Sequence, residues 1–268
     1  MAGASAKKTT IKEPIIRTDN SGTTELMLND PEKYNTLSRE VLDAILGELA
    51  DIAVDESVRA VVISARGKAF CSGHNLKQMQ GNRTSTYYQQ LLADCSAMMQ
   101  AIVALPQPVI AKVQGMATAA GCQLVASCDL AIAGHSAQFA TNGINNGLYC
   151  ATPAVAVSRT VARKHALEML LTGDFMSAER AAAIGLINHA VADNELDDVV
   201  ASLTDKLAQK SQFALRLGKS SFHRQLNQPL DAAYRSAAND LVCNLMAPDG
   251  IEGVDAFFEK REPHWDNK

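Results

Sequence analysis

Five short apolar runs, rich in β-branched residues, recur along the chain and are mostly separated by segments with a helical period. They occupy residues 25–28, 60–64, 109–113, 130–133 and 186–191. Strands that alternate with helices are joined by crossover connections, which pair the strands in parallel. The sequence therefore predicts an α/β fold with a mainly parallel sheet. A length of 268 residues with 47% hydrophobic content is enough for one substantial core.

The helical segments carry their own boundary signals. Ser38 precedes an apolar stripe that ends at Ile52, which predicts a helix with a serine N-cap. Residues 84–105 repeat the pattern, and Pro106 closes it. Beyond residue 191 the sequence predicts helices only, at residues 194–210, 229–246 and 248–261. A C-terminal segment of this kind cannot complete a sheet.

Two turns of small residues each follow a buried strand, in residues 69–76 (AFCSGHNL) and 115–124 (GMATAAGCQL). Turns of this kind expose backbone N–H groups. Two such groups that converge on one point form a site for a developing oxyanion, which polarises a thioester carbonyl toward an enolate. One glycine turn alone would indicate only a tight connection, whereas the pair indicates a functional site.

With these turns and several further motifs, the chain resembles the crotonase (enoyl-CoA hydratase/isomerase) superfamily from about Thr24 to Trp265. The further motifs are residues 35–37 (NTL), 127–132 (SCDLAI), 139–147, 185–187 (GLI) and 252–261 (EGVDAFFEKR). The resemblance implies a ββα spiral core and a C-terminal helical region that forms trimer contacts. It divides the chain into a disordered tail at 1–15, the spiral core with its oxyanion hole at 16–200, and a helical segment for oligomerisation and CoA covering at 201–268.

The resemblance also assigns the polarising groups and the acid–base positions. The backbone N–H groups of His74 and Ala120 become the oxyanion donors, and the helix that begins near Ala120 directs its N-terminal dipole toward them. Hydratases of the family use two glutamates to hold and deprotonate a water. The matching positions here are Gln123 and Gly143, and neither can act as a Brønsted base near pH 7.

Two further side chains are candidates for chemistry. The His74 imidazole follows an oxyanion amide and can relay protons, although a histidine beside a turn is more often simply hydrogen-bonded. A Cys150 thiolate would be a base or a nucleophile, whereas a buried free cysteine is usually inert. For CoA itself, the resemblance implies contacts from Lys33, Leu37, Ala69, Lys77, Phe257 and Lys260.

Composition excludes several other classes. A net charge of −4 with scattered basic residues argues against a nucleic-acid partner. None of the six cysteines forms a C-x-x-C pair, so we expect reduced thiols, no metal site and no covalently bound cofactor. The sequence has no run of about eighteen apolar residues for a membrane span and no secretory signal. The first ten residues lack arginine, so we expect a cytoplasmic protein, with a mitochondrial location as the alternative.

The sequence thus predicts a protein that binds acyl-CoA and polarises its thioester, in the lyase or isomerase class of fatty acid metabolism, with CoA only as part of the substrate. Residues 117–128 and 147–153 resemble a subgroup that keeps the hydratase fold and lacks its glutamates. One alternative is a non-catalytic acyl-CoA binder or assembly subunit. A third is a thioester hydrolase that uses Cys150. We expect a homotrimer or a hexamer made of two trimers.

Overall fold

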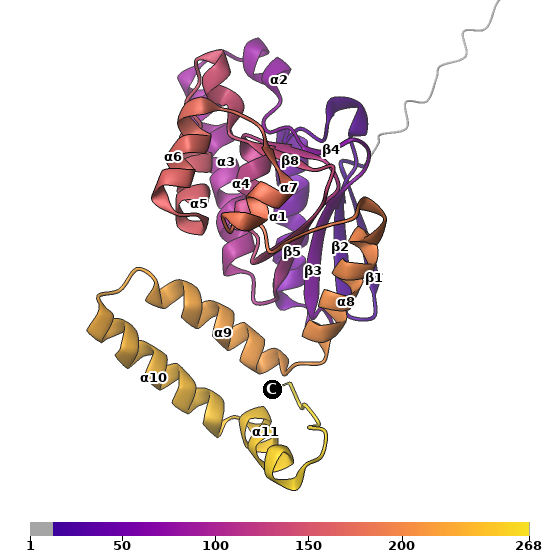
Figure 1. Ribbon diagram of the computed structural model, residues 1–268, viewed down its shortest axis with the longest axis vertical. Coiled ribbons are helices and arrows are strands. Elements are labelled where there is room, and N and C mark those ends of the chain that lie inside the picture. The colour runs from indigo at the N-terminus through magenta and orange to yellow at the C-terminus, as the bar shows by residue number, and fades with distance from the viewer. Residues whose placement is uncertain (1–12, 268) are drawn as a thin grey trace, which may run out of the picture.

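A computed structural model describes residues 13–267 and contains two sheets (Figure 1). The larger sheet has six strands in the order β1-β2-β3-β5-β7-β10, and all neighbours are parallel except the antiparallel pair β1 and β2. Its strands are β1 (Ile15–Asn20), β2 (Thr23–Leu28), β3 (Ala60–Ala65), β5 (Val109–Val113), β7 (Leu130–Gly134) and β10 (His189–Val191). The predicted mainly parallel sheet is confirmed.

The smaller sheet has four strands in the order β4-β6-β8-β9, which are β4 (Ala69–Cys71), β6 (Met116–Thr118), β8 (Gln138–Ala140) and β9 (Met176–Ser177). Strand β4 follows β3 after a short turn, and β6 follows β5 and β8 follows β7 in the same way. Each coil of the chain therefore contributes one strand to each sheet before a helix begins the next coil. This repetition is the predicted ββα spiral.

Eleven α-helices complete the part of the chain between residues 13 and 267. They are α1 (Arg39–Val54), α2 (Leu76–Gly81), α3 (Ser85–Ala104), α4 (Ala120–Ser127), α5 (Ala151–Thr160), α6 (Arg163–Thr172), α7 (Ala178–Ala183), α8 (Leu196–Ala208), α9 (Gln212–Gln225), α10 (Leu230–Met246) and α11 (Pro248–Glu259). The side chain of Ser38 accepts a hydrogen bond from the Val41 amide, and Thr84 accepts one from Tyr87. The predicted N-cap at Ser38 is confirmed, and Thr84 caps the second predicted helix in the same way.

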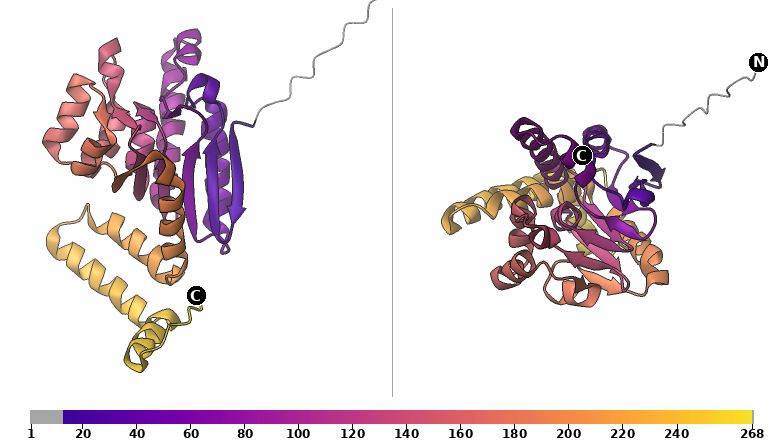
Figure 2. Two further views of the ribbon diagram at one scale, coloured as in Figure 1. Left: turned by 45° about the vertical axis from the view of Figure 1, so that its right-hand side comes forward. Right: turned by 90° about the horizontal axis from the view of Figure 1, so that it is seen from above.

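Helices cover both faces of the larger sheet. The main core joins this sheet to α1, α3 and α4 and includes Ile45, Ile63 and Met98. On the other face, α8 packs Leu196 and Val200 against the sheet. The two views of Figure 2 show α8 beside the strands and away from the main helical layer.

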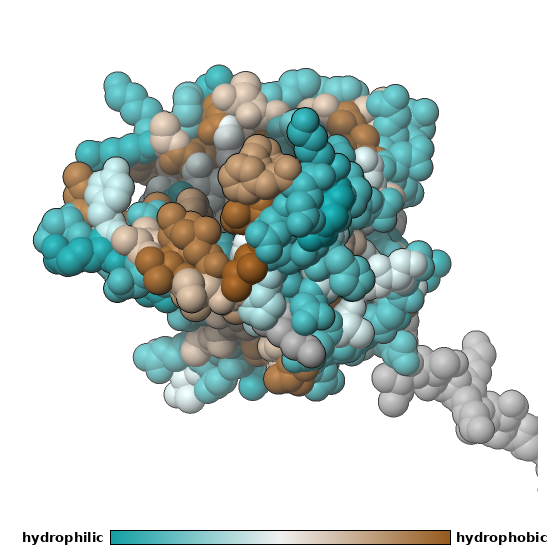
Figure 3. All heavy atoms as spheres, turned by 90° about the horizontal axis from the view of Figure 1, so that it is seen from below, coloured by the Kyte–Doolittle hydropathy of each residue, from teal (hydrophilic) through white to brown (hydrophobic). Residues whose placement is uncertain are grey.

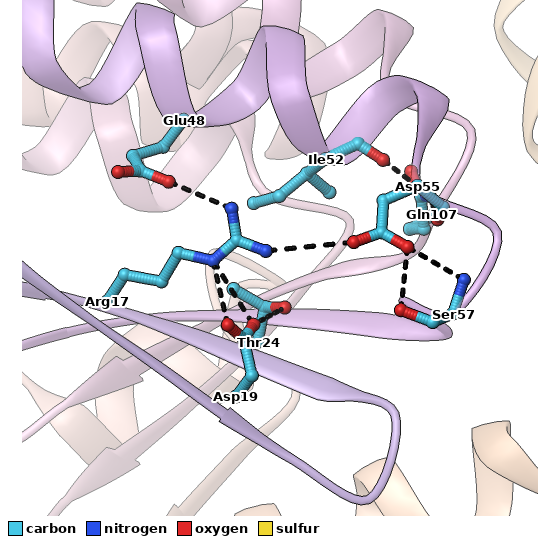
Figure 4. Close-up of polar contacts among 8 residues, drawn as sticks. All are labelled: Arg17, Asp19, Thr24, Glu48, Ile52, Asp55, Ser57 and Gln107. Carbon is cyan, nitrogen blue, oxygen red and sulfur yellow. Dashed lines mark hydrogen bonds and ion pairs between the residues drawn. The ribbon is translucent and has the colours of Figure 1, made fainter.

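A polar cluster fixes the N-terminal hairpin to helix α1 (Figure 4). Arg17 on β1 donates hydrogen bonds to Asp19 and to Glu48 of α1, each at 3.0 Å. Thr24 on β2 donates to the same Asp19 at 2.6 Å, and this bond, together with that from Arg17, lowers the pKa of the Asp19 carboxyl. The antiparallel edge of the sheet is therefore held by charge-assisted bonds as well as by apolar packing.

Helices α9, α10 and α11 form a C-terminal arm that projects from the end of the molecule opposite α2 (Figures 1 and 2). Lys219 of α9 joins the arm to the core. Its ammonium donates to the carbonyls of Ile102 and Gln107, both at 3.0 Å, and lies 2.6 Å from Asp129. Only 8% of the Lys219 side chain is exposed. Burial lowers the pKa of Lys219, and Asp129 opposes this shift.

The arm exposes many large apolar side chains. Figure 3, which views the molecule from the side of the arm, shows such side chains gathered on this face. The exposed apolar residues of α10 and α11 include Leu241, Val242, Met246, Phe257 and Phe258. An apolar surface of this kind on a projecting element is characteristic of a contact with another protein surface.

Four sequence-based expectations differ from the structure. Helix α9 was not among the predicted helices. The predicted strand at 186–191 is regular only from His189, because Asn188 pairs with Ala131 through its side-chain oxygen and its backbone amide, both at 2.8 Å. Strand β1 begins at Ile15, within the predicted tail, whose residues 1–12 lie outside the described residues. The predicted boundary at 200 falls inside α8, and the arm begins at Gln212.

Candidate active site

The two predicted turns lie side by side, because β4 and β6 pair in parallel and end at the same edge of the smaller sheet. A Cβ atom placed on Gly73 would lie 3.2 Å from the backbone nitrogen of Ala120. Among residues 13–267, the N–H groups of His74 and Ala120 donate no hydrogen bond. The two turns are therefore adjacent, and each carries one backbone N–H without a partner in the described part of the chain.

A strained residue orients the second donor. Ala119 has φ 50° and ψ −117°, a region that favours glycine, and its own N–H donates to the Ala140 carbonyl at 2.9 Å. The Ala119 carbonyl accepts from Gln123 at 3.0 Å and so begins α4. Ala120 is the first residue of this helix, so its N–H has no partner in the helix.

A loop near the N-terminus holds the first turn in place. The buried Asn35 side chain donates to the carbonyls of Arg66 and Ala69, both at 2.8 Å. The N–H of the fully buried Leu37 donates to the Gly73 carbonyl at 2.8 Å, one residue before His74. Leu37 and Ala69, both predicted to contact CoA, therefore support the turn through their backbones.

Close backbone contact between successive coils sets the spacing of the two turns. A Cβ atom on Gly121 would lie only 2.0 Å from the Cys71 carbonyl oxygen. Only glycine allows α4 to approach β4 so closely. Any side chain at this position would push the Ala120 amide away from the first turn.

The two positions that carry glutamates in hydratases differ in their surroundings. Gln123 is buried on α4, and its side-chain oxygen has no hydrogen-bond partner among the described residues. A Cβ atom on Gly143 would lie 2.6 Å from the Leu148 carbonyl oxygen and 2.8 Å from the Cys150 sulfur. The space beside position 143 is therefore already filled.

His74 carries a titratable side chain next to the donors. Both of its ring nitrogens are buried and unpartnered within residues 13–267. Burial lowers the pKa of His74, and the Leu37 backbone opposes this in part. The ring is therefore a neutral imidazole near pH 7, which is the form that can accept a proton.

The Cys150 thiol is a weak candidate for chemistry. Burial raises its pKa, and the Gly143 backbone opposes this only in part. A thiol with a raised pKa is protonated near neutral pH and is a poor nucleophile. Among the described residues, no histidine or lysine hydrogen-bonds to it.

A cavity of about 480 Å³ opens beside the first turn. Leu148, whose N–H donates to the Gly143 carbonyl at 3.0 Å, closes one side. The Tyr88 hydroxyl donates to the Met79 carbonyl at 3.1 Å and joins α2 to α3. The lining is mostly apolar and consists of Leu76, Met79, Gln80, Arg83, Tyr88, Leu91, Leu92 and Leu148. This size and character suit a small organic ligand.

This cavity was not predicted, although the spacing of residues 76, 79 and 80 places them on one helical face. A larger hollow of about 690 Å³ lies between α8 and the strands β7 and β10. It contains no residue of either turn, so the smaller cavity is the one that belongs to the candidate site.

The predicted CoA-contacting cations lie in two separate places. Lys33 pairs with Asp30 at 3.1 Å, and Lys77 is exposed at the second residue of α2, close to the first turn. Phe257, of which 77% is exposed, lies on α11, and Lys260 directly follows this helix, at the opposite end of the molecule from α2 (Figure 1). One protomer therefore does not bring these two groups to the same site.

Comparison with known proteins identifies the class. Residues 18–268 match the model of the Enoyl-CoA hydratase/isomerase family. The chain belongs to this family, as its crotonase-like spiral indicates. It is 49% identical to an enoyl-CoA hydratase from Mycobacterium smegmatis, whose crystal structure superposes with a TM-score of 0.93 over 94% of this chain and 98% of that one.

Within the family, the chain is similar to enoyl-CoA hydratase domain-containing protein 3, the subgroup that the sequence predicts. The rat protein is 43% identical over 244 residues, which are 91% of this chain and 81% of that protein. The human crystal structure is 42% identical and has a TM-score of 0.92 over 94% of this chain and 100% of that one. The rat and human proteins carry the word mitochondrial in their names. In residues 13–267, no helix has the length and apolar character needed to cross a membrane.

Proposed function

We propose that the chain binds acyl-CoA thioesters and polarises their carbonyl oxygen with the backbone N–H groups of His74 and Ala120. The observation that carries this proposal is the pair of adjacent, unpartnered donors, together with a mostly apolar cavity whose lining begins at Leu76, two residues after His74. The N-terminus of α4 adds a positive dipole at the same point. The apolar cavity suits the acyl chain, and in this proposal Lys33 and Lys77 would meet the phosphates.

The reaction that this site supports best is proton transfer through an enolate. A proton leaves the carbon next to the thioester for an imidazole nitrogen of His74, and the electron pair moves onto the thioester oxygen between the two N–H groups. The neutral, buried ring of His74 suits this role. Hydration of an enoyl thioester needs an activated water, and Gln123 and Gly143 provide no carboxylate for it.

Binding is tested by thermal unfolding with CoA thioesters from short to long chain. At one hundred times the dissociation constant, a ligand stabilises the folded protein by about 2.7 kcal/mol and raises the melting temperature. If no thioester raises it, the proposed function is wrong. Turnover is tested by exchange of the α-hydrogen with deuterium in heavy water. His74→Gln should abolish this exchange, while the matched variant His189→Gln, on an exposed strand end of β10, should preserve it.

A non-catalytic acyl-CoA binder is the second candidate. The observations in its favour are the amide at position 123 and the filled space at position 143. Binding without α-hydrogen exchange for any thioester would establish it. The third candidate, hydrolysis through Cys150, lacks the lowered pKa that it requires. Loss of thioester hydrolysis in Cys150→Ala would restore it.

We also propose a homotrimer, or a hexamer of two trimers, formed through the C-terminal arm. The exposed apolar side chains of the arm support this assembly, and it would let Phe257 and Lys260 reach the site of a neighbouring copy. A stable particle of 28.7 kDa by light scattering at micromolar concentration would contradict the proposal. Cytoplasmic location stays a prediction, which cell fractionation tests against the mitochondrial location named for the relatives.

A further inference from the structure

Given that the chain binds acyl-CoA as proposed, we infer that its preferred acyl chain ends in a second carboxylate, which the guanidinium of Arg83 binds. The inference concerns the far end of the cavity, away from the two backbone donors. It names the class of substrate as the CoA thioesters of medium-length dicarboxylic acids.

The cavity lining runs along one face of α2 and the turn after it, from the side of the proposed donors to Arg83. Leu76 lies two residues after His74, and the lining continues with Met79, Gln80 and Arg83. Leu76, Met79 and Gln80 share one face of α2, and Arg83 follows in the turn just after this helix. A chain that starts at the thioester site and follows this face meets apolar side chains first and the guanidinium last.

The charge of Arg83 has no partner of its own. Within residues 13–267 it makes no ion pair and no side-chain hydrogen bond, and no acidic residue lines the cavity. By contrast, Arg17 and Arg261 each pair with carboxylates. A guanidinium presents a planar fork of donors that matches a carboxylate, and an apolar surrounding strengthens such a pair. A carboxylate on the ligand would supply the missing partner.

The dimensions of α2 set the expected chain length. Six residues at about 1.5 Å per residue give α2 a length of about 9 Å, and His74 and Arg83 each lie two residues beyond its ends. An extended chain advances about 1.2 Å per bond, so about seven bonds span this distance. Eight carbons, as in a suberoyl chain, therefore fit, while a five-carbon glutaryl chain ends before the arginine.

The test measures the dissociation constants of suberoyl-CoA, octanoyl-CoA, glutaryl-CoA and CoA by isothermal titration calorimetry. Hydrogen bonds to charged groups contribute about 1.5–3 kcal/mol, so we expect suberoyl-CoA to bind at least about tenfold more tightly than octanoyl-CoA. The ratio should decrease as salt is added, because Arg83 is exposed to solvent. Glutaryl-CoA should gain no such advantage.

The variant Arg83→Gln should remove the preference for suberoyl-CoA and leave the affinity for octanoyl-CoA unchanged. Arg163→Gln, at an exposed first residue of α6, is the matched control and should change neither. Equal binding of suberoyl-CoA and octanoyl-CoA by the wild type would overturn the inference and leave the proposed function intact. An equal loss for all ligands and CoA in Arg83→Gln would assign the arginine to CoA phosphates and also overturn it. Absence of binding by every thioester would refute the proposed function itself.

Discussion

Replacing Gln123 and Gly143 by glutamate would supply the two carboxylates of a hydratase, but the structure predicts that this double change is hindered by packing. Gln123→Glu preserves the shape of the side chain. A Cβ atom at position 143, in contrast, lies 2.6 Å from the Leu148 oxygen and 2.8 Å from the Cys150 sulfur. Real Cβ atoms essentially never approach other atoms closer than 3.0 Å, so both neighbours must move.

The expected loss of stability can be estimated from the usual cost of overpacking a tightly packed site. Adding carbon atoms to a tightly packed site costs about 1–3 kcal/mol of unfolding free energy. For a chain of this size each kcal/mol lowers the melting temperature by roughly 2–4 °C. We therefore expect Gly143→Ala, which adds only the Cβ atom, to lower the melting temperature by roughly 2–12 °C. Gly47→Ala in α1, where a Cβ atom meets nothing within 4 Å, is the control and should be neutral or stabilising.

The rate of crotonyl-CoA hydration should be limited by the same packing at position 143. Each acid–base group is worth about 10²–10⁴-fold, so hydration of crotonyl-CoA by the wild type should be slower than in a two-glutamate enzyme by several orders of magnitude. The double glutamate variant should recover only part of this lost hydration rate. Adding Cys150→Ala removes one of the two obstructing atoms and should increase both stability and hydration further.

The assays are thermal unfolding at fixed protomer concentration and the loss of enoyl absorbance on hydration. An unchanged melting temperature in Gly143→Ala would refute the packing argument. Strong hydratase activity of the wild type would show that another group, with His74 and Cys150 as the first candidates, activates the water.

Three further predictions concern stability. Lys219→Met leaves the Asp129 carboxylate, of which 18% is exposed, without its nearest cation, so urea unfolding should show a loss of up to about 3–5 kcal/mol, and a loss below about 1 kcal/mol would contradict the role given to this pair. Ala119→Gly should be stabilising by up to about 1 kcal/mol in the same assay, because glycine adopts φ 50° without strain, and a destabilised variant would show that the strain is absent. The pKa of His74 is lower in the folded protein than its usual 6.5, so the unfolded state binds the extra proton and stability should fall as the pH drops through 6.5 toward the folded-state pKa. Urea unfolding against pH should lose this slope in His74→Gln; an identical slope in both proteins would contradict the burial of the ring.

Local signals were sufficient to predict most of the fold. Ser38 and Thr84 mark helix starts because their side chains cap backbone amides, and that chemistry does not depend on distant parts of the chain. Helix α9 lacked such a signal. Gln212 is its only buried residue, and a charged residue, Lys219, makes its main attachment to the core. A pattern of buried apolar positions cannot predict a helix that docks through an ammonium group.

The candidate site also has a part that could be predicted from local sequence and a part that could not. The positions of the two small-residue turns, which carry the proposed donors His74 and Ala120, could be predicted because a motif on one segment fixes a local turn. What fills the space at Gly143 could not, because Leu148 and Cys150 reach it only after the chain has turned through residues 142–146. The arm is another such case, since its distance from α2 depends on the path of the whole chain (Figure 1).

Both proposed donors at the candidate site belong to the main chain, whereas the groups at positions 123 and 143 are side chains. Mutation therefore affects the polarising groups and the proton-transferring groups differently. A single substitution at position 123 or 143 adds or removes a proton-transferring group. Among the standard substitutions, only proline deletes a backbone N–H. A lineage with this fold can therefore pass through many sets of side chains, each with different proton chemistry, without losing its two backbone donors. Selection has to maintain mainly the glycine contacts, such as that of Gly121 with Cys71, that keep the two turns adjacent.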